Sequence, residues 1–324
     1  MANTLPEQVG LGPTWQALLH PIIRSLQVPK LPGIDCNKCR MVQEGGFHPF
    51  ARCCNIYPEF PNFLAGEVLE HGQREGSSAT VEGWITGGRS GPAYVHKPPS
   101  MHDKYNNENY ENVRDIPPCP LLDEAGHCTV YAQRPHTCIE YNCVYPLYPE
   151  IIAFWHAFHS LLGLHSYVTS RYLLQALSMD VDAYKDAWNS NTNEAIWGDG
   201  LTMSPDFHSQ LWQGNEPVSF YKSCHHYVIE NQETIRNEVE EFRRQQLLEK
   251  AQQEQNEARQ EVLQSMSYDL GYFEPPLELW EQVSVGKHIA PEDNPWTLTE
   301  YEGYLLWLHK AMLGRYQMEL SKQG

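Results

Sequence analysis

Positive charge is scarce in this chain of 324 residues. It has 23 Lys and Arg against 41 Asp and Glu, which gives a formal net charge of −18 at pH 7. A surface that binds nucleic acid or an anionic membrane needs a net basic footprint. We therefore expect neither nucleic acid nor a membrane among the partners of this protein.

Long apolar runs are also missing. No stretch reaches 18 apolar residues, and the opening MANTLPEQVG has neither the basic region nor the apolar segment of a signal peptide. These absences predict a cytoplasmic protein. Hydrophobic residues nevertheless make up 41% of the chain, which excludes wholesale disorder and allows a sizeable core.

Several catalytic motifs are absent as well. The sequence has no GxGxxG, GxxxxGK[ST] or G-x-S-x-G pattern, no paired-acid motif and no internal repeat. The glycine-rich stretch 83–94 contains Arg89 and could approach a nucleotide, but a hairpin turn is the favoured interpretation. We assign no catalytic residue and no residue that binds an organic cofactor.

Cysteine, in contrast, is abundant and clustered. Four of the nine cysteines fall in CPLLDEAGHCTVYAQRPHTCIEYNC, residues 119–143, and four more form Cys36-x2-Cys39 and the pair Cys53-Cys54. Thiolates are soft donors that suit zinc or an iron–sulfur cluster. An odd number of cysteines in a reducing compartment favours metal over the alternatives of disulfides or unconnected core thiols.

The spacing of the cysteines bears on the kind of metal. A four-thiolate zinc site normally has two short CxxC knuckles, whereas this chain has one, and the later spacings are 8, 9 and 4 residues. This favours iron–sulfur over zinc. Within the first group, 13 residues separate Cys39 from Cys53. The sequence leaves open whether the two cysteine groups form separate metal centres or share one. The predicted metal ligands are Cys36, Cys39, Cys53, Cys54, Cys119, Cys128, Cys138 and Cys143.

The second cysteine group follows the pattern CPLL…GxCxVYxxRPxxCxxYxC, and the first ends in Cys53-Cys54-Asn55-Ile56-Tyr57-Pro58 before Pro61–Gly66. Over residues 36 to 160 this resembles the YkgJ-like cysteine-cluster proteins, a CxxCxxCC zinc- or iron-chelating family that includes flagellin lysine N-methylases. The resemblance implies one or two iron–sulfur clusters of the 4Fe-4S type, and methyl transfer from S-adenosylmethionine by analogy alone.

Three functions stay open at this point. The chain is an iron–sulfur enzyme or an accessory protein of modification chemistry, a non-catalytic module for electron transfer or metal handling, or a structural zinc protein that binds a partner. Arg134-Pro135 should hold an extended turn that aims Cys138 at the site, with Arg134 donating hydrogen bonds to sulfur.

Other candidate ligands receive structural interpretations. His20, His156 and His159 lie on apolar helical stretches typical of core residues, and His48 lies in a loop where exposed histidines are common. Cys224 is interpreted as a spare thiol, so the adjacent His225 and His226 are left unassigned.

The predicted fold is mainly α, with an irregular cysteine-rich metal-binding core. Residues 1–188 would form a cysteine-cluster domain with core helices, and 189–324 a helical C-terminal region. Its long charged helix or helical hairpin, 227–266, would be peripheral and could dock a protein partner. Apolar spacing and capping predict further helices at 15–26, restarted or kinked at Pro21, and at 62–71, 150–179 (one helix or two, broken near Gly163), 181–188 and 297–320. Residues 73–118 and 189–217 are expected to be irregular.

Overall fold

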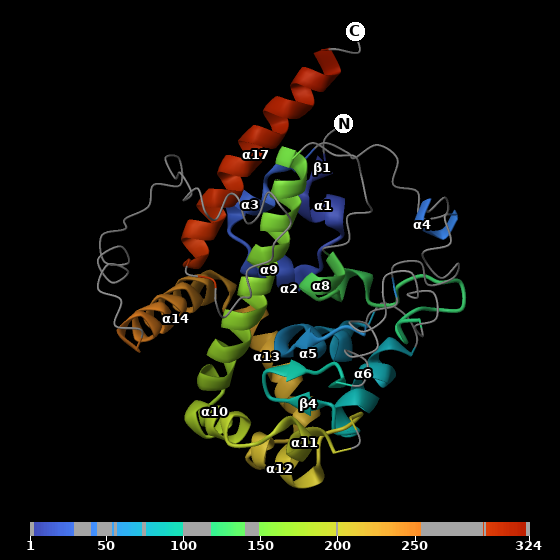
Figure 1. The fold of residues 1–324 in the computed structure, drawn as a ribbon, viewed down its shortest axis with the longest axis vertical. Helices are drawn as coiled ribbons and strands as arrows, with labels where there is room; N and C mark the ends of the chain where they lie inside the picture. The colour runs from blue at the N-terminus through green and yellow to red at the C-terminus, as the bar shows by residue number, and fades with distance from the viewer. Residues whose placement is uncertain are drawn as a thin grey trace.

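The computed structural model describes residues 3–28, 40–43, 54, 57–72, 76–99, 118–139, 149–198, 200–253, 294 and 296–321. Within these ranges the protein is mainly helical, as predicted (Figure 1). The helices are α1 Leu5–Val9, α2 Pro13–Leu18, α3 Pro21–Arg24, α4 Arg40–Gln43, α5 Asn62–His71, α6 Ser77–Thr86, η3 Tyr131–Gln133, α8 His136–Ile139, α9 Pro149–Ala176, α10 Val181–Asn189, α11 Asn193–Trp197, α12 Pro205–Trp212, α13 Pro217–Glu230, α14 Gln232–Gln253 and α17 Leu298–Ser321.

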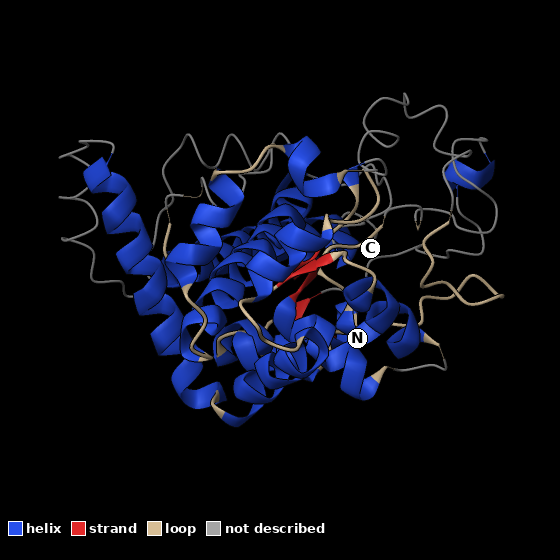
Figure 2. Ribbon diagram, turned by 90° about the horizontal axis from the view of Figure 1, so that it is seen from below, coloured by secondary structure: helices blue, strands red, loops and turns tan. Residues whose placement is uncertain are grey.

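Short strands lie among these helices (Figure 2). They are β1 Asn3–Thr4, β2 Gln27–Val28, β3 Phe60–Pro61, β4 Ser90–Gly91 and β5 Tyr94–Val95. β1 pairs antiparallel with β2, and β3, β5 and β4 form a second antiparallel sheet in that order. Gly91 pairs with Tyr94 across a two-residue turn, so the glycine-rich stretch around Arg89 ends a helix and then forms a hairpin. The hairpin interpretation is confirmed.

α9 is the central element of the molecule. It runs unbroken for 28 residues through Gly163, which decides between the one helix and the two that the sequence allowed. α17 lies along it and α14 crosses towards one edge of the molecule (Figure 1). α17 begins with the predicted capping box, in which the backbone N–H of Thr297 donates to the Glu300 carboxylate and the Glu300 N–H donates to the Thr297 hydroxyl at 3.3 Å.

A second close contact joins α5 to α13. The two backbones meet at Gly66, where an added Cβ would lie 2.0 Å from the carbonyl oxygen of Tyr221. Glycine is therefore required for this crossing. Because α5 belongs to residues 1–188 and α13 to 189–324, both predicted regions contribute to one continuous hydrophobic core. The division at residue 188 stays a prediction.

The charged stretch 227–266, predicted as one peripheral helix or a helical hairpin, is divided between the end of α13 and α14, and its residues 254–266 lie outside the described part of the chain. Asn231 interrupts it, and its side-chain amide donates to the Tyr227 carbonyl at 2.9 Å, a local bond that competes with the helical ladder. Ile235 and Val239 are buried where α14 packs against α2, α9 and α17. One face of α14 thus belongs to the core, and docking of a partner on this helix stays a prediction.

Two predicted irregular segments contain helices. α6 lies within 73–118, and α11 and α12 lie within 189–217. A further short helix, α1, lies near the N-terminus, and its Leu5 is fully buried. Among the described helices none is both long enough and apolar enough to span a lipid bilayer.

Candidate metal centre

The first two described cysteines of the second group are held by a tight turn. Leu122 pairs antiparallel with Cys128, and the backbone N–H and hydroxyl of Thr129 both donate to the Leu121 carbonyl at 2.9 Å. Asp123 closes the turn, because its carboxylate accepts the backbone N–H of His127 at 2.8 Å. This turn brings Cys128 close enough to Cys119 for their charges to interact.

Cys138 is positioned by the Arg134-Pro135 pair. Arg134 has φ −58° and ψ 134°, the extended geometry expected before a proline, and α8 starts directly after Pro135. The Cys138 N–H donates to the Pro135 carbonyl at 2.9 Å. The extended geometry predicted for Arg134 is confirmed, and the role of the pair in aiming Cys138 at a metal stays a prediction.

The side chain of Arg134 donates its hydrogen bonds to backbone carbonyls, whereas the sequence predicted bonds to sulfur. Its Nε donates to the Tyr131 carbonyl at 2.8 Å and its Nη2 to the Val9 carbonyl at 2.7 Å, while the guanidinium stacks on the Tyr131 ring. The Arg134 carbonyl in turn accepts the indole N–H of Trp15 at 2.9 Å. These donors therefore bind backbone oxygen rather than sulfur, and Arg134 fastens the cysteine loop to α1 and α2.

Cys54, from the first cysteine group, joins the second group. The Cys119 N–H donates to the Cys54 carbonyl at 2.8 Å. Burial raises the pKa of the Cys119 thiol to about 12; a backbone hydrogen bond at Leu121 opposes this rise, and the charges of Cys54 and Cys128 add to it. Cys54 and Cys119 therefore approach each other through both backbone and side chain.

The three neighbouring thiols also influence Cys138. Burial raises the pKa of its thiol, the charges of Cys119, Cys128 and Cys54 raise it further, and the positive charge of Arg134 opposes them. Cys119 and Cys138 therefore each lie within electrostatic range of the other three thiols. All four cysteines are half-buried and reduced, so the fold gathers one thiol of the first group and three of the second into one region.

This convergence falls short of a formed coordination sphere. Within the described part of the chain, no three His, Cys, Asp or Glu side chains are arranged closely enough to hold a metal ion. Cys36, Cys39, Cys53, Cys143 and the loop residue His48 lie outside the described residues. The eight-cysteine ligand set therefore stays a prediction.

The other candidate ligands lie elsewhere. Cys224 is completely buried in α13, and burial raises the pKa of its thiol well above the ordinary value. His225 is hydrogen-bonded to the Thr14 hydroxyl at 3.1 Å, and His226 lies on the surface 3.8 Å from Glu70. The placement of Cys224 agrees with the interpretation of a spare core thiol.

The three helical histidines have separate surroundings. His20 is the N-cap of α3 and accepts the Ile22 N–H at 3.2 Å, so it is a capping residue rather than a core residue. On α9, His159 is buried with its ring 5.1 Å from that of His136, and His156 is half-buried. None of them belongs to a metal-binding group among the described residues.

No protein-family model matches the chain, and no curated protein or solved structure is significantly similar to it. The resemblance to the YkgJ-like proteins therefore rests on the cysteine motifs themselves.

Sequence reasoning missed a cavity beside the cysteine loop. It has a volume of about 600 Å³ and is bordered by His136 and Thr137, which directly precede Cys138. Its other walls come from β5, α9, α10 and α11, together with Glu59. No local motif signals such a cavity, because its lining is assembled from segments that are far apart in the chain.

Proposed function

We propose that this protein binds a metal through cysteine thiolates, with Cys54, Cys119, Cys128 and Cys138 among the ligands of one centre. The supporting observation is the convergence of Cys54 with three cysteines from the other group, through the 2.8 Å backbone hydrogen bond between Cys119 and Cys54 and the mutual electrostatic influence of the thiols. An iron–sulfur cluster is the favoured occupant and zinc the alternative.

The chemistry of the donor set supports a cation at this place. Gathering several partly buried thiols makes it costly to ionise any of them, because burial and neighbouring negative charge both oppose the thiolate. A metal ion removes that cost, since it binds thiolates directly and offsets their repulsion. The motif resemblance and the loose spacing favour iron over zinc, because thiolates that surround a cluster need not come from short knuckles.

A centre shared by both cysteine groups is the form of the proposal that the fold favours. Cys54 lies with Cys119 rather than apart from it, which supports one centre assembled from both groups over two independent ones. The remaining cysteines then supply either further ligands of this centre or a second one.

The adjoining cavity supports an active rather than a purely structural centre. His136 and Thr137 line the cavity and precede Cys138 by one or two residues. A small molecule bound there would lie next to the thiolate loop. We therefore favour an iron–sulfur enzyme or accessory protein over a structural zinc protein or a closed electron-transfer module.

Replacing single cysteines tests the proposal. Cys119→Ser, Cys128→Ser, Cys138→Ser and Cys54→Ser should each lose most of the bound metal, since a hydroxyl is a poor ligand for iron or zinc at such sites. Metal content and the visible absorption spectrum are measured on protein purified without oxygen. One 4Fe-4S cluster gives about four iron atoms per chain, and two give about eight.

Cys224→Ala is the matched control, because it removes a buried thiol that lies in the α13 core. It should retain the metal and the spectrum. Stoichiometric zinc with no visible absorption would establish the zinc alternative. Full metal content in Cys119→Ser or Cys54→Ser would contradict the shared centre.

A further inference from the structure

The 600 Å³ cavity beside the cysteine loop has aromatic walls. The rings that line it include Tyr94 on β5, Tyr184 and Trp188 on α10, and Trp197 on α11. Its volume lies within the range of pockets that hold small organic molecules. We name it the aromatic cavity.

A carboxylate lies at one part of this lining. Glu59 accepts a hydrogen bond from Nδ1 of His96 at 2.8 Å. Burial would raise the pKa of Glu59, but the hydrogen bond from His96 and the charges of His96, Lys97 and His136 outweigh it and hold the pKa below its ordinary value. The His96 ring is largely buried and its Nδ1 bond holds the Glu59 side chain, which is about half exposed, in place.

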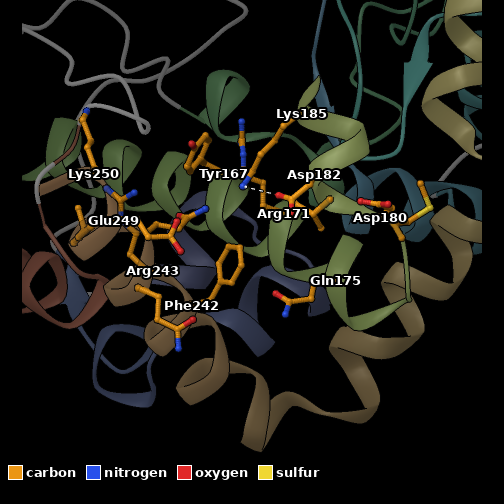
Figure 3. A pocket seen from close by; sticks show the side chains of 15 residues that line it. Tyr167, Arg171, Gln175, Asp180, Asp182, Lys185, Phe242, Arg243, Glu249 and Lys250 are labelled. Atoms are coloured by element: carbon orange, nitrogen blue, oxygen red, sulfur yellow. Dashed lines mark ion pairs between the residues drawn. The ribbon is translucent and has the colours of Figure 1, made fainter. Parts of the chain in front are cut away.

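A cation lies at another part of the lining. Arg171 projects from α9, and its guanidinium stacks on the ring of Tyr167 at 3.7 Å. Tyr167 and Arg171 also border a neighbouring hollow of about 820 Å³ between α9 and α14, where Figure 3 shows them close together. Among the described residues Arg171 makes no ion pair with a carboxylate, although acidic residues outnumber basic ones almost two to one in this chain.

Glu59 and Arg171 both lie near the rings of Tyr94 and Tyr184, but they do not form an ion pair with each other. Burial raises the pKa of Tyr184 to about 12; the positive charge of Arg171 opposes this rise, and the negative charge of Glu59 adds to it. The pKa of Tyr94 is likewise raised by burial and influenced by both Arg171 and Glu59. Glu59 and Arg171 are thus near the same two tyrosines, yet no ion pair within 4.0 Å joins them.

We propose that the aromatic cavity binds a small α-amino carboxylate with an aromatic or large apolar side chain. Arg171 would bind the carboxylate through its planar fork, Glu59 would bind the ammonium group, and the tyrosine and tryptophan rings would cover the side chain. A zwitterion satisfies both charged groups at once, which an anion or a cation alone cannot do. The proposal does not depend on the identity of the metal.

Three probes of nearly equal shape test this assignment by calorimetry on the full chain as purified. L-Phenylalanine carries both charges, 3-phenylpropionate carries only the carboxylate and phenethylamine carries only the ammonium group. L-Phenylalanine should bind at least about tenfold more tightly than either of the others, as expected when one charge-assisted contact is lost.

Two variants connect each charge to its residue. Arg171→Gln should reduce the affinity for L-phenylalanine to that for phenethylamine and leave phenethylamine binding unchanged. Glu59→Gln should remove the advantage of the ammonium group in the same way, so that L-phenylalanine binds like 3-phenylpropionate. Arg171→Lys keeps the charge but loses the fork and the stacking, and should give an intermediate affinity.

Arg244→Gln and Glu70→Gln are matched controls, because both residues form half-exposed ion pairs outside the cavity. They should bind all three probes like the parent protein. Equal affinity for the three probes, L-phenylalanine binding that survives Arg171→Gln, or no binding of L-phenylalanine at concentrations on the order of 10 mM would overturn the proposal.

Discussion

Glu302 shows how a single buried carboxyl group makes this fold sensitive to pH. It is 6% exposed on α17, where one carboxylate oxygen accepts the His20 backbone N–H at 3.4 Å. Burial raises the pKa of Glu302 to about 8; the His20 N–H opposes this rise, the charge of Glu240 adds to it and that of Arg236 opposes it. The folded protein therefore keeps a proton here that the unfolded chain releases near its ordinary value of 4.5.

The sign of the effect follows from proton linkage. Because the folded state binds more protons than the unfolded state between the two pKa values, Glu302 lowers the free energy of unfolding as the pH rises from about 5 to about 8. The slope is at most about 1.4 kcal/mol per pH unit, and the contribution is complete below the unfolded pKa. Stability should therefore be lost through this window.

Glu302→Gln tests this directly, since glutamine fills the site but cannot ionise. The variant should gain stability relative to the parent protein at about pH 8 and lose that advantage at about pH 5, as measured by urea unfolding at several pH values. Glu82→Gln, an exposed change on α6, is the control. Parallel pH profiles for the parent and Glu302→Gln would contradict the assignment.

The close contact between α5 and α13 requires glycine at position 66, because a side chain there would collide with the facing helix. Gly66→Ala would place a Cβ 2.0 Å from the Tyr221 carbonyl oxygen, and a backbone oxygen in a packed helix cannot move away cheaply. We expect a loss of about 3 kcal/mol in the free energy of unfolding, although alanine is the better helix former. Thermal or urea unfolding measures the loss.

Gly83→Ala on α6 is the matched control. An added Cβ there meets no atom within 4 Å, so the same substitution should stabilise the protein by about 0.5 to 1 kcal/mol through helix propensity. Opposite signs for the two variants would establish close helix packing as the cause. Equal effects would show that α5 and α13 can separate at no cost.

The helices that could be predicted from the sequence are those with a strong local signal. α5 has its predicted bounds and is followed by Gly72, and the boundary of α17 follows from the Thr297–Glu300 capping box. α6 could not be predicted in this way. It is rich in serine, threonine and glycine, and its Val81 and Ile85 are buried by packing against other helices, which is information from distant parts of the chain.

In the candidate site, too, some features follow from the local sequence and others do not. The extended geometry of Arg134 follows from the proline after it, because that constraint is local. The hydrogen bond from Cys119 to Cys54 and the approach of Arg171 to the rings around Glu59 join residues far apart in sequence. They depend on the packing of segments that are distant in the chain, which no spacing rule encodes.

On the scale of the whole molecule, α9 and α17 join the two ends of the chain. Leu305 on α17 is completely buried, and α17 packs along α9 within the same core that contains Trp15 and Phe63 from the N-terminal segments. A core shared in this way should unfold as one unit, because the loss of any part exposes apolar surface on the rest.

Leu305→Ala tests whether residues 1–188 and 189–324 unfold together. Truncating a fully buried leucine should cost about 2 to 5 kcal/mol. If the core is shared, hydrogen exchange in low denaturant should accelerate in α5 and α9 as much as in α17, because all of these amides then exchange through the same global opening. Leu201→Ala, at a position 48% exposed, should leave exchange in all three helices unchanged. Acceleration confined to α17 would show that the C-terminal region opens independently and would favour the predicted boundary at residue 188.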